Sequence, residues 1–438
     1  MNIGVIGGGV SGIRAALTLA RAGYRVTLFE KNKHLGGRVF SFLTPDFGEV
    51  DIGQHIWLRC CTAIEQLLAD LAVPDEWIFR QDRVAMTYRY PDGDVRILAA
   101  NWLPGSLSLL PMLWGARLGW LDTLKYLWSS LRARFYFDST LETLDNITMA
   151  QWLHDQGQPA AAIELFWEPF IVGVCNARLD KVSARHGLFA MRESLFRSGY
   201  ASAICFLRRP LSAVFDGHAR KVLAQSGVDV RTGAAINQIM PGTPVTVCDN
   251  VGRQHDFDKV ILALPLKRMR MLLPQANLPE APGEGAIAGL LLKFAQPVMD
   301  EMFFSAVGSL VQVVFNKTAI WQKPSEDGSQ IVEVVISAAE REAKLGVERV
   351  SGELLPELAK LLPRVASTPL LAKRLLVHAT ATFHVQPGGE ARRLPIARPD
   401  LANILFAGDY AMTGWPSTME SGIRAGESAA RVILEGTT

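Results

Sequence analysis

The chain opens with an apolar run, a glycine-rich turn and a helical pattern in close succession. The β-branched run at residues 2–6 predicts a strand, and the Ala- and Leu-rich residues after the glycines repeat with helical periodicity. Gly23 predicts the end of that helix, and residues 24–29 form a second apolar run that leads to Glu30. This order of strand, tight turn, helix and strand predicts the opening unit of a Rossmann-like domain.

The glycines between the first strand and the helix carry a chemical prediction. Gly7, Gly9 and Gly12 have G-x-G-x-x-G spacing, which permits a tight turn, close approach to a pyrophosphate and close packing of helix on strand. The helix N-terminus offers free N–H groups to phosphates, and Glu30 stands where a carboxylate accepts hydrogen bonds from an adenosine ribose. The sequence therefore predicts a site for an adenine dinucleotide, and we include in it Val10, Ser11 and Lys31.

The hydrophobic pattern changes character after residue 100. Residues 84–98 alternate as two strands joined at a Pro-Asp-Gly turn, whereas residues 101–137 are rich in Trp and Leu with scattered basic residues, namely Arg117, Lys125, Arg132 and Arg134. Two interpretations remain open. The segment forms helices that lie in a bilayer interface and admit a lipid, or it forms core helices of a substrate domain.

A second helical pattern contains a candidate catalytic acid. Ile163, Phe166, Trp167, Phe170 and Val174 fall on one apolar face, after a capping box that begins at Thr148. Pro169 predicts a kink, and Glu168 beside it is either a buried carboxyl that holds a proton or a solvent-facing side chain on the opposite face.

Composition narrows the function classes. The length of 438 residues predicts two domains, and 45 Lys and Arg against 43 Asp and Glu give a net charge of +2, which does not indicate a nucleic-acid partner. The five cysteines form no C-x-x-C pair and are interpreted as reduced thiols, and we predict no metal site. The N-terminus lacks the pattern of a cleavable signal, and no run reaches the about 18 apolar residues of a spanning helix. The hydrophobic content of 49% indicates an apolar ligand or a membrane-facing patch. We expect a cytoplasmic protein that associates peripherally with the inner face of the cytoplasmic membrane.

A glycine pair after the second strand extends the nucleotide site. Residues 35–38 read Leu-Gly-Gly-Arg, so that Gly36 and Gly37 let the backbone run beside a cofactor while Arg38 reaches its phosphates; a flexible turn with an exposed arginine is the alternative. With the opening glycines and Glu30, this element resembles the FAD superfamily of amine oxidases and phytoene desaturases. The resemblance implies FAD as cofactor and an α/β fold of the glutathione-reductase and amine-oxidase type, with a second substrate-binding domain of mixed sheet and helices.

The resemblance also assigns residues along the chain. Residues 51–55 read Asp-Ile-Gly-Gln-His, and it implies that this segment, with Gln54 and His55, lies against the flavin; a packed histidine remains the alternative for His55. Ile236 is implied to meet the adenine through its backbone. The closing segment is implied to reach the ribityl chain and flavin through Gly408, Asp409, Pro416, Thr418 and Met419. The implied FAD-binding domain comprises residues 1–80, 211–285 and 396–438, and the substrate domain comprises residues 81–210 and 286–395.

Residues 150–184 carry a narrower resemblance. Their pattern QWL...QGQPAAAIELFWEPFIVGVCN...KVSA is similar to the squalene-associated FAD-dependent enzymes, the hydroxysqualene dehydroxylases of bacterial squalene and hopanoid synthesis. It implies replacement of the allylic hydroxyl of a C30 isoprenoid by hydrogen, with upstream squalene-pathway enzymes as possible partners. Such a reaction needs an acid, for which the candidates in order are Glu168, His55 and Asp51, and aromatic faces such as Trp167, Phe166 and Phe170 for an allylic cation.

Three other functions stay open. A carotenoid or phytoene-type desaturase shares the apolar cavity. A flavin amine oxidase usually places an aromatic residue where Thr418 stands and a lysine in the strand that contains Lys293. A prenyl-binding carrier has no flavin and lacks an intact phosphate loop, which is present here.

Overall fold

The computed structural model describes residues 1–103, 105–280, 282–322 and 327–436. Its central element is a five-stranded sheet in the order β10-β2-β1-β14-β20, in which every neighbouring pair is parallel. The strands are β1 (Asn2–Ile6), β2 (Arg25–Glu30), β10 (Asp229–Thr232), β14 (Lys259–Leu262) and β20 (Ile404–Phe406). The predicted opening unit is confirmed, because α1 (Val10–Arg21) connects β1 to β2.

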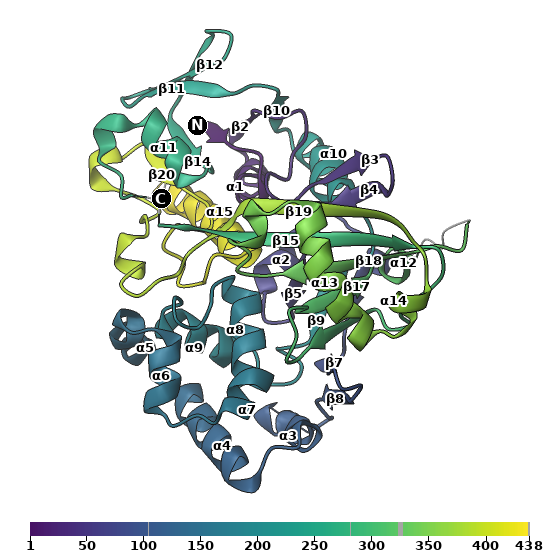
Figure 1. Cartoon of the computed structure of the whole chain (residues 1–438). Coiled ribbons are helices and arrows are strands. Elements are labelled where there is room, and N and C mark those ends of the chain that lie inside the picture. Colours follow the sequence, from purple (N-terminus) through teal and green to yellow (C-terminus); the bar gives the residue numbers. More distant parts are fainter. Residues whose placement is uncertain (104, 281, 323–326, 437–438) are drawn as a thin grey trace.

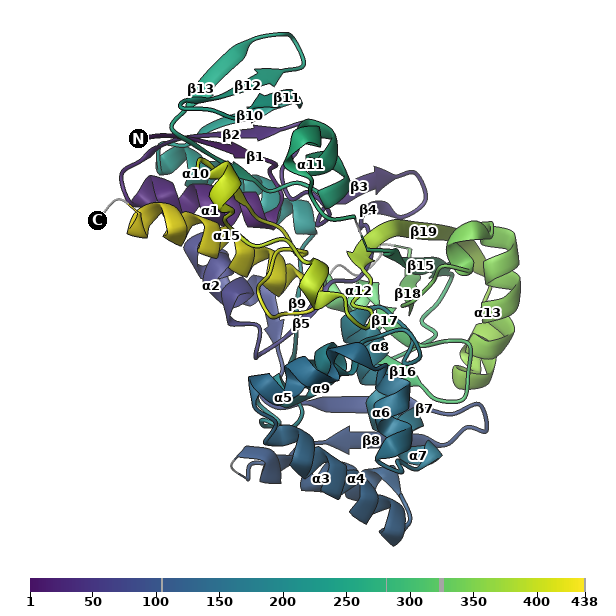
Figure 2. The same cartoon turned by 90° about the vertical axis from the view of Figure 1, so that its left-hand side faces the viewer.

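Helices cover one face of this sheet and a small sheet covers the other (Figure 2). The helical face carries α1, α2 (Thr62–Asp70), α10 (Ala219–Gln225) and α15 (Met419–Glu435). The opposite face carries β11 (Ile236–Met240), β12 (Val245–Asp249) and β13 (Gln254–Phe257), followed in the chain by α11 (Leu266–Leu272). Helices α1 and α15 touch through their backbones, since a Cβ on Gly426 would lie 2.1 Å from the carbonyl oxygen of Ser11. Arg14 of α1 pairs with Asp70 of α2 and Glu427 of α15, so this position binds three helices together.

A second, seven-stranded sheet has the order β19-β15-β18-β17-β16-β7-β8. It joins β7 (Ala85–Arg89) and β8 (Val95–Ala99), which form the predicted hairpin, to β15 (Glu284–Phe294), β16 (Phe303–Ala306), β17 (Val313–Asn316), β18 (Gln330–Ile336) and β19 (Leu370–Phe383). Helix α13 (Val347–Leu361), followed by α14 (Arg364–Ser367), covers one face through a shared apolar core. Alternate residues of the strands face opposite ways, so Val334 packs in that core while Val335 lines a cavity on the other side.

Small elements connect the two sheets. Strands β5 (Ile56–Leu58), β6 (Ile78–Arg80) and β9 (Ile204–Leu207) form a three-stranded sheet, β3 (Ser41–Thr44) pairs with β4 (Gly48–Asp51), and α12 (Lys317–Ile320) follows β17. Because β9 lies in the predicted substrate domain and β5 and β6 in the predicted FAD domain, this sheet crosses the boundaries that the sequence predicts.

Helices gather at the end of the molecule opposite the parallel sheet (Figure 1). They are α3 (Leu110–Ala116), α4 (Trp120–Arg134), α5 (Asp138–Thr143), α6 (Met149–Asp155), α7 (Ala160–Ala162), α8 (Glu168–Cys175) and α9 (Ala184–Glu193), with a π-helical turn at Ile163–Trp167. Thr148 caps α6 as predicted, since its Oγ1 accepts the N–H of Gln151 at 3.1 Å. The fold is thus α/β with a second part of mixed sheet and helices. Within the described residues no helix combines the length and the apolar character needed to cross a bilayer.

Candidate functional site

The predicted phosphate loop has a backbone that only glycine fits at two positions. Gly7 has φ +108°, and a Cβ there would lie 2.3 Å from the carbonyl oxygen of Ala263. A Cβ on Gly12 would lie 1.9 Å from the carbonyl oxygen of Gly7. These contacts hold the start of α1 against β1 and β14, as expected of the first and third glycines of this spacing.

The second glycine pair lies directly beside the first loop. Gly36 donates its N–H to the carbonyl oxygen of Gly8 at 2.9 Å, and a Cβ on Gly37 would lie 2.9 Å from the Cα of Gly9. Two loops separated in the chain by α1 and β2 therefore form one glycine-lined wall. No side chain caps the N-terminus of α1, which begins at this wall.

Polar side chains on the same wall hold the loop or remain without a partner. The buried carboxylate of Glu30 accepts the N–H of Gly8 at 2.8 Å and the N–H of Asn32 at 2.9 Å. The buried Oγ of Ser11 has no hydrogen-bond partner among the described residues. An uncapped helix N-terminus with an unpaired hydroxyl fits a bound phosphate group.

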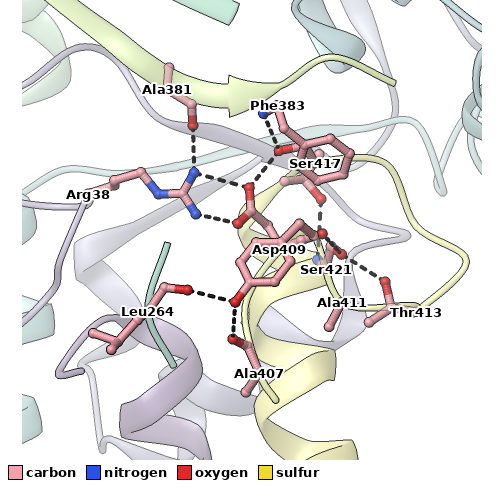
Figure 3. Close-up of polar contacts among 12 residues, drawn as sticks. Arg38, Leu264, Ala381, Phe383, Ala407, Asp409, Ala411, Thr413, Ser417 and Ser421 are labelled. Carbon is pink, nitrogen blue, oxygen red and sulfur yellow. Dashed lines mark hydrogen bonds and ion pairs between the residues drawn. The ribbon is translucent and has the colours of Figure 1, made fainter. Parts of the chain in front are cut away.

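Arg38 and Asp409 join the two ends of the chain (Figure 3). Nη2 of Arg38 lies 2.5 Å from Oδ1 of Asp409 and Nη1 lies 3.0 Å from Oδ2, while Ser417 donates its Oγ–H to the same carboxylate at 2.6 Å. Burial alone would raise the pKa of Asp409, but the adjacent guanidinium lowers it below the usual value for aspartate. The groups predicted to reach the phosphates and hydroxyls of FAD are thus paired with each other at the cavity wall.

A buried arginine that the sequence did not single out holds the closing segment. Arg393 donates to the carbonyl oxygens of Asp409 (2.8 Å), Ala411 (2.6 Å) and Trp415 (2.7 Å). Beyond this loop, Thr418 caps α15, its Oγ1 accepting the N–H of Ser421 at 3.3 Å. The signal available in the sequence was a pair of adjacent arginines, Arg392 and Arg393, in a polar segment, and this pattern does not distinguish Arg393 from a surface residue.

One cavity of about 930 Å³ joins these elements to the substrate side. Its wall includes every predicted cofactor residue except Gly12, whose role is packing: Gly7, Gly9, Val10, Ser11, Glu30, Lys31, Gly36, Gly37, Arg38, Gln54, His55, Ile236, Gly408, Asp409, Pro416, Thr418 and Met419. The structure therefore brings the predicted residues together, and their individual contacts with FAD stay predictions.

The far end of the same cavity is apolar and aromatic. Its wall comes from the second sheet and the helices, and includes Met86, Tyr88, Met112, Phe166, Phe170, Val174, Phe303 and Phe315. Phe166 is itself held by stacking on Tyr126, with ring centroids 4.7 Å apart. Trp167 is not on this wall, because it is fully buried and donates its Nε1–H to Gln158 at 2.9 Å, so its predicted position at the substrate is wrong.

The prediction of a buried acid at Glu168 is also wrong. The side chain is exposed and lies outside the cavity wall, whereas Phe166, Pro169, Phe170 and Gly173 line it. These four positions are spaced by three, four and seven residues and so share one helical face, which places position 168 on the opposite face. The solvent-facing alternative is the one observed.

The two other acid candidates differ in position. Asp51 is buried behind the wall, where it accepts the Oγ–H of Ser41 at 2.7 Å and the N–H of Leu211 at 2.9 Å, so it does not reach the cavity. His55 does line the cavity, and its Nδ1 lies 3.0 Å from the carbonyl oxygen of Gly53. Burial lowers the pKa of His55, and burial lowers the pKa of the neighbouring wall residue His378 to about 4.

A buried lysine behind Gln54 is a second feature that the sequence analysis missed. Lys317 of α12 is only 1% exposed, and its Nζ donates to Oε1 of Gln54 at 2.6 Å. Asp51 at 3.7 Å and Glu333 at 3.6 Å flank the ammonium group. Burial raises the pKa of Glu333 despite that ammonium group. The available signal was a charged residue within each of two apolar runs, 313–320 and 330–336.

Lys293, the lysine considered for an amine-oxidase role, does not line the cavity and pairs with Asp327 at 3.2 Å. In the same strand, Gly289 lies against the buried carboxyl of Glu333, since a Cβ at Gly289 would lie 2.4 Å from Oε1 of Glu333.

The cavity wall also contains a carboxylate that the sequence did not indicate. This residue is Glu193 at the end of α9, which pairs with Arg192 at 3.0 Å.

Comparisons with known proteins agree with this geometry. Residues 10–434 match the family described as flavin containing amine oxidoreductase. A hydroxysqualene dehydroxylase of Rhodopseudomonas palustris is 26% identical over 99% of this chain and 98% of its own length. A 15-cis-phytoene desaturase of Glycine max is 22% identical over 99% of this chain and 80% of its own length.

Solved structures share the fold. Putrescine oxidase bound to putrescine has a TM-score of 0.73 at 17% identity, with 99% of both chains covered. Cyclohexylamine oxidase from Brevibacterium oxydans has a TM-score of 0.70 at 17% identity, with 100% of this chain and 99% of that chain covered. The predicted resemblance and the FAD cofactor are confirmed. The chain belongs to the flavin-containing amine oxidoreductase family and is an FAD-dependent oxidoreductase.

Proposed function

We propose that this oxidoreductase removes the allylic hydroxyl of hydroxysqualene and replaces it with hydrogen, giving squalene and water. The observation that carries the proposal is the continuous cavity that runs from the FAD-binding wall to an end lined by apolar and aromatic side chains. The match to a hydroxysqualene dehydroxylase over nearly the full length of both proteins supports it.

The chemistry that FAD supplies when bound is hydride transfer. In the proposed reaction a proton is added to the hydroxyl oxygen, the C–O bond breaks, water leaves, and a hydride forms the new C–H bond. The chain must therefore deliver a proton and tolerate an allylic cation. Phe166 and Phe170 present aromatic rings to the chamber, and such rings stabilise cations through their π faces.

We assign the proton donor to His55, the one of the three predicted acids that lies on the cavity wall. Because the Gly53 carbonyl accepts a hydrogen bond from Nδ1–H, Nε2 is the nitrogen free to carry the transferred proton. Burial lowers its pKa, so the imidazolium becomes scarce as the pH rises. The rate of reduction should therefore rise as the pH falls toward that pKa.

The deciding experiment uses the purified FAD-loaded protein without oxygen. Pre-reduced protein mixed with hydroxysqualene should give squalene in a single turnover, as scored by mass spectrometry. Oxidised protein is incubated in parallel with phytoene and with amines. Dehydrogenated phytoene or an oxidised amine in the absence of squalene would contradict the proposal.

Variants of His55 test the assignment of the acid. His55→Asn should lower the single-turnover rate and remove its pH dependence. Glu193→Gln is the comparison, because Glu193 is a carboxylate on the same wall. The role would move to Glu193 if His55→Asn kept the wild-type rate and pH dependence while Glu193→Gln lowered the rate and removed its pH dependence.

A carotenoid-type desaturase is the second candidate. Relatives named 15-cis-phytoene desaturase match 99% of this chain at 21–23% identity, and a cavity with an apolar, aromatic end suits their named substrate equally well. Desaturation removes hydride from a hydrocarbon and needs no proton donor for a hydroxyl group. The phytoene arm of the same experiment distinguishes the two.

A further inference from the structure

Exposed aromatic side chains are concentrated at the helical end of the molecule. Four tryptophans and two phenylalanines there are between 63% and 88% exposed, namely Trp102, Trp114, Trp120, Trp128, Phe135 and Phe137. Large apolar side chains are costly to expose, and a contiguous group of them marks a contact surface. Other strongly exposed apolar residues, such as Leu43 and Val251, lie in separate parts of the chain.

Helix α4 has two distinct faces. Tyr126, Ser129 and Ala133 are buried against the protein, whereas Leu124, Trp128 and Leu131 point outward. The outward residues are spaced by four and three, so they form one apolar stripe along the helix. In Figure 2, α3 and α4 lie together at the end of the molecule farthest from the parallel sheet.

Basic residues are interspersed with this stripe. Arg117, Lys125 and Arg132 are exposed among the aromatic side chains. Exposed Trp and Leu beside Lys and Arg are typical of helices that lie in a bilayer interface, with apolar groups below the headgroups and cations at anionic lipid. A protein partner would not require this arrangement of tryptophan around basic residues.

The inner side of the same helices reaches the cavity. Met112 of α3 is part of the cavity wall, while Trp114, two residues later, is 88% exposed. One short helix thus separates the apolar chamber from the exposed aromatic surface. A lipid held in a bilayer would have to pass only this layer to reach the chamber.

We propose that Trp102 and the exposed apolar and basic residues of the segment 110–137 form a docking surface for an anionic lipid bilayer, and that apolar substrate enters the cavity from the bilayer beside α3. The docking statement stands on the exposed residues alone. The entry statement rests on the proposed function, because it requires an apolar lipid substrate.

Vesicle flotation tests the docking surface without any substrate. The FAD-loaded protein is mixed with vesicles of phosphatidylglycerol and phosphatidylcholine in equal amounts, or of phosphatidylcholine alone. Wild type should float with the anionic vesicles, and the double variant Trp114→Glu and Trp128→Glu should bind them about tenfold or more weakly. Lys125→Glu with Arg132→Glu should weaken binding to the anionic vesicles about tenfold, with little change on phosphatidylcholine.

The matched control is Leu43→Glu with Val251→Glu, which adds the same charges at exposed apolar positions outside the patch. The control should float like wild type, and all variants should keep bound FAD as judged by flavin absorbance. Equal flotation of the Trp variant and the control would overturn the proposal. A second outcome would also overturn it: wild type does not float, and it forms a concentration-dependent dimer that the Trp variant abolishes. The surface would then bind a second copy of the chain.

Substrate presentation tests the entry path. The Trp variant should reduce turnover of hydroxysqualene in vesicles while leaving turnover in detergent micelles unchanged. Loss of turnover to the same extent in both would overturn entry through this surface. Absence of turnover in wild type would contradict the proposed function. The flotation experiment would still test docking, because it uses no substrate.

Discussion

The two ends of the cavity are built by different kinds of contact. At the FAD end, backbone groups and ion pairs fix the wall, as in the Gly36 to Gly8 hydrogen bond and the Arg38–Asp409 pair. At the apolar end, side chains from β7, α3, α8 and β17 meet mainly by packing, and Tyr88 of β7 adds one hydrogen bond, from its hydroxyl to the carbonyl oxygen of Leu165 at 3.3 Å. The first end depends on positions where a particular residue is required, whereas the second accepts any apolar side chain of suitable volume. Specificity for substrate can therefore vary without loss of the cofactor.

The largest effect is expected at the FAD end, from Gly12→Ala. The added Cβ would lie 1.9 Å from the carbonyl oxygen of Gly7, so α1 would have to move away from β1. We expect a loss of about 3 kcal/mol or more of folding free energy and protein isolated without flavin. Denaturant unfolding and flavin absorbance measure these effects.

Gly352→Ala is the control for this prediction. Gly352 lies inside α13, and a Cβ there would meet nothing within 4 Å, so alanine fits without strain. It should stabilise the protein by up to about 1 kcal/mol through helix propensity. If Gly12→Ala kept wild-type stability and flavin, the idea that backbone contact defines this end would fail.

The next largest effect is expected from Lys317→Met. The substitution leaves Asp51 and Glu333 buried without their shared cation, and breaking a buried pair in this way costs about 3–5 kcal/mol. Burial already raises the pKa of Glu333, so the folded protein binds a proton there more tightly than the unfolded chain does. Stability of the variant should therefore fall more steeply than that of wild type as the pH rises above the ordinary pKa of glutamate.

Lys293→Met provides the contrast with Lys317→Met. Lys293 is partly exposed and pairs with the exposed Asp327, so its removal should cost less than about 1 kcal/mol. Thermal unfolding across a pH series compares the two. Equal costs for the two lysines would show that the buried cluster does not depend on its cation.

A smaller effect is expected from Asp409→Asn. The depressed pKa of Asp409 means that its pairing with Arg38 stabilises the fold above the ordinary pKa of aspartate. This contribution is lost as the pH falls through the depressed value, so the unfolding curves of wild type and variant should converge at acid pH. At neutral pH we expect a loss of about 1–3 kcal/mol and weaker retention of FAD, measured by unfolding and by equilibrium dialysis.

Asp400→Asn is the control for Asp409→Asn, because Asp400 forms an exposed pair with Arg398 at 2.6 Å. The Asp400→Asn variant should retain FAD as well as wild type does. A pH-independent difference between Asp409→Asn and wild type would contradict the role assigned to the ion pair.

The sequence was most informative where function needs neighbouring residues. Three parts of the site are local patterns in the sequence: the β1-turn-α1 unit, the Gly36–Gly37 pair and the Gly408–Asp409 pair of the closing segment. The structure places all of them on one wall. Arg393, Lys317 and Glu333 could not be read in this way, because their partners are distant in the chain and burial alone makes them important. Trp167 and Glu168 show the limit of periodicity. Trp167 belongs to the apolar stripe yet packs in the core, and Glu168 lies on the opposite face, so an apolar stripe does not reveal which of its members reach the cavity.

The smallest effect is expected from Glu168→Gln, on the face of helix α8 that points away from the cavity. The comparison variant is Phe170→Ala, on the face that lines the cavity. Glu168 is exposed and off the cavity wall, so its neutral variant should change stability by less than about 0.5 kcal/mol and leave single-turnover reduction unchanged. Phe170 lies two residues away on the wall, and its truncation should lower kcat/KM for an apolar substrate about tenfold while flavin absorbance stays as in wild type. If Glu168→Gln lowered the rate and Phe170→Ala did not, the helix would face the cavity with its other side during the reaction. The apolar end would then be set by a movement of α8 and not by the packing described above.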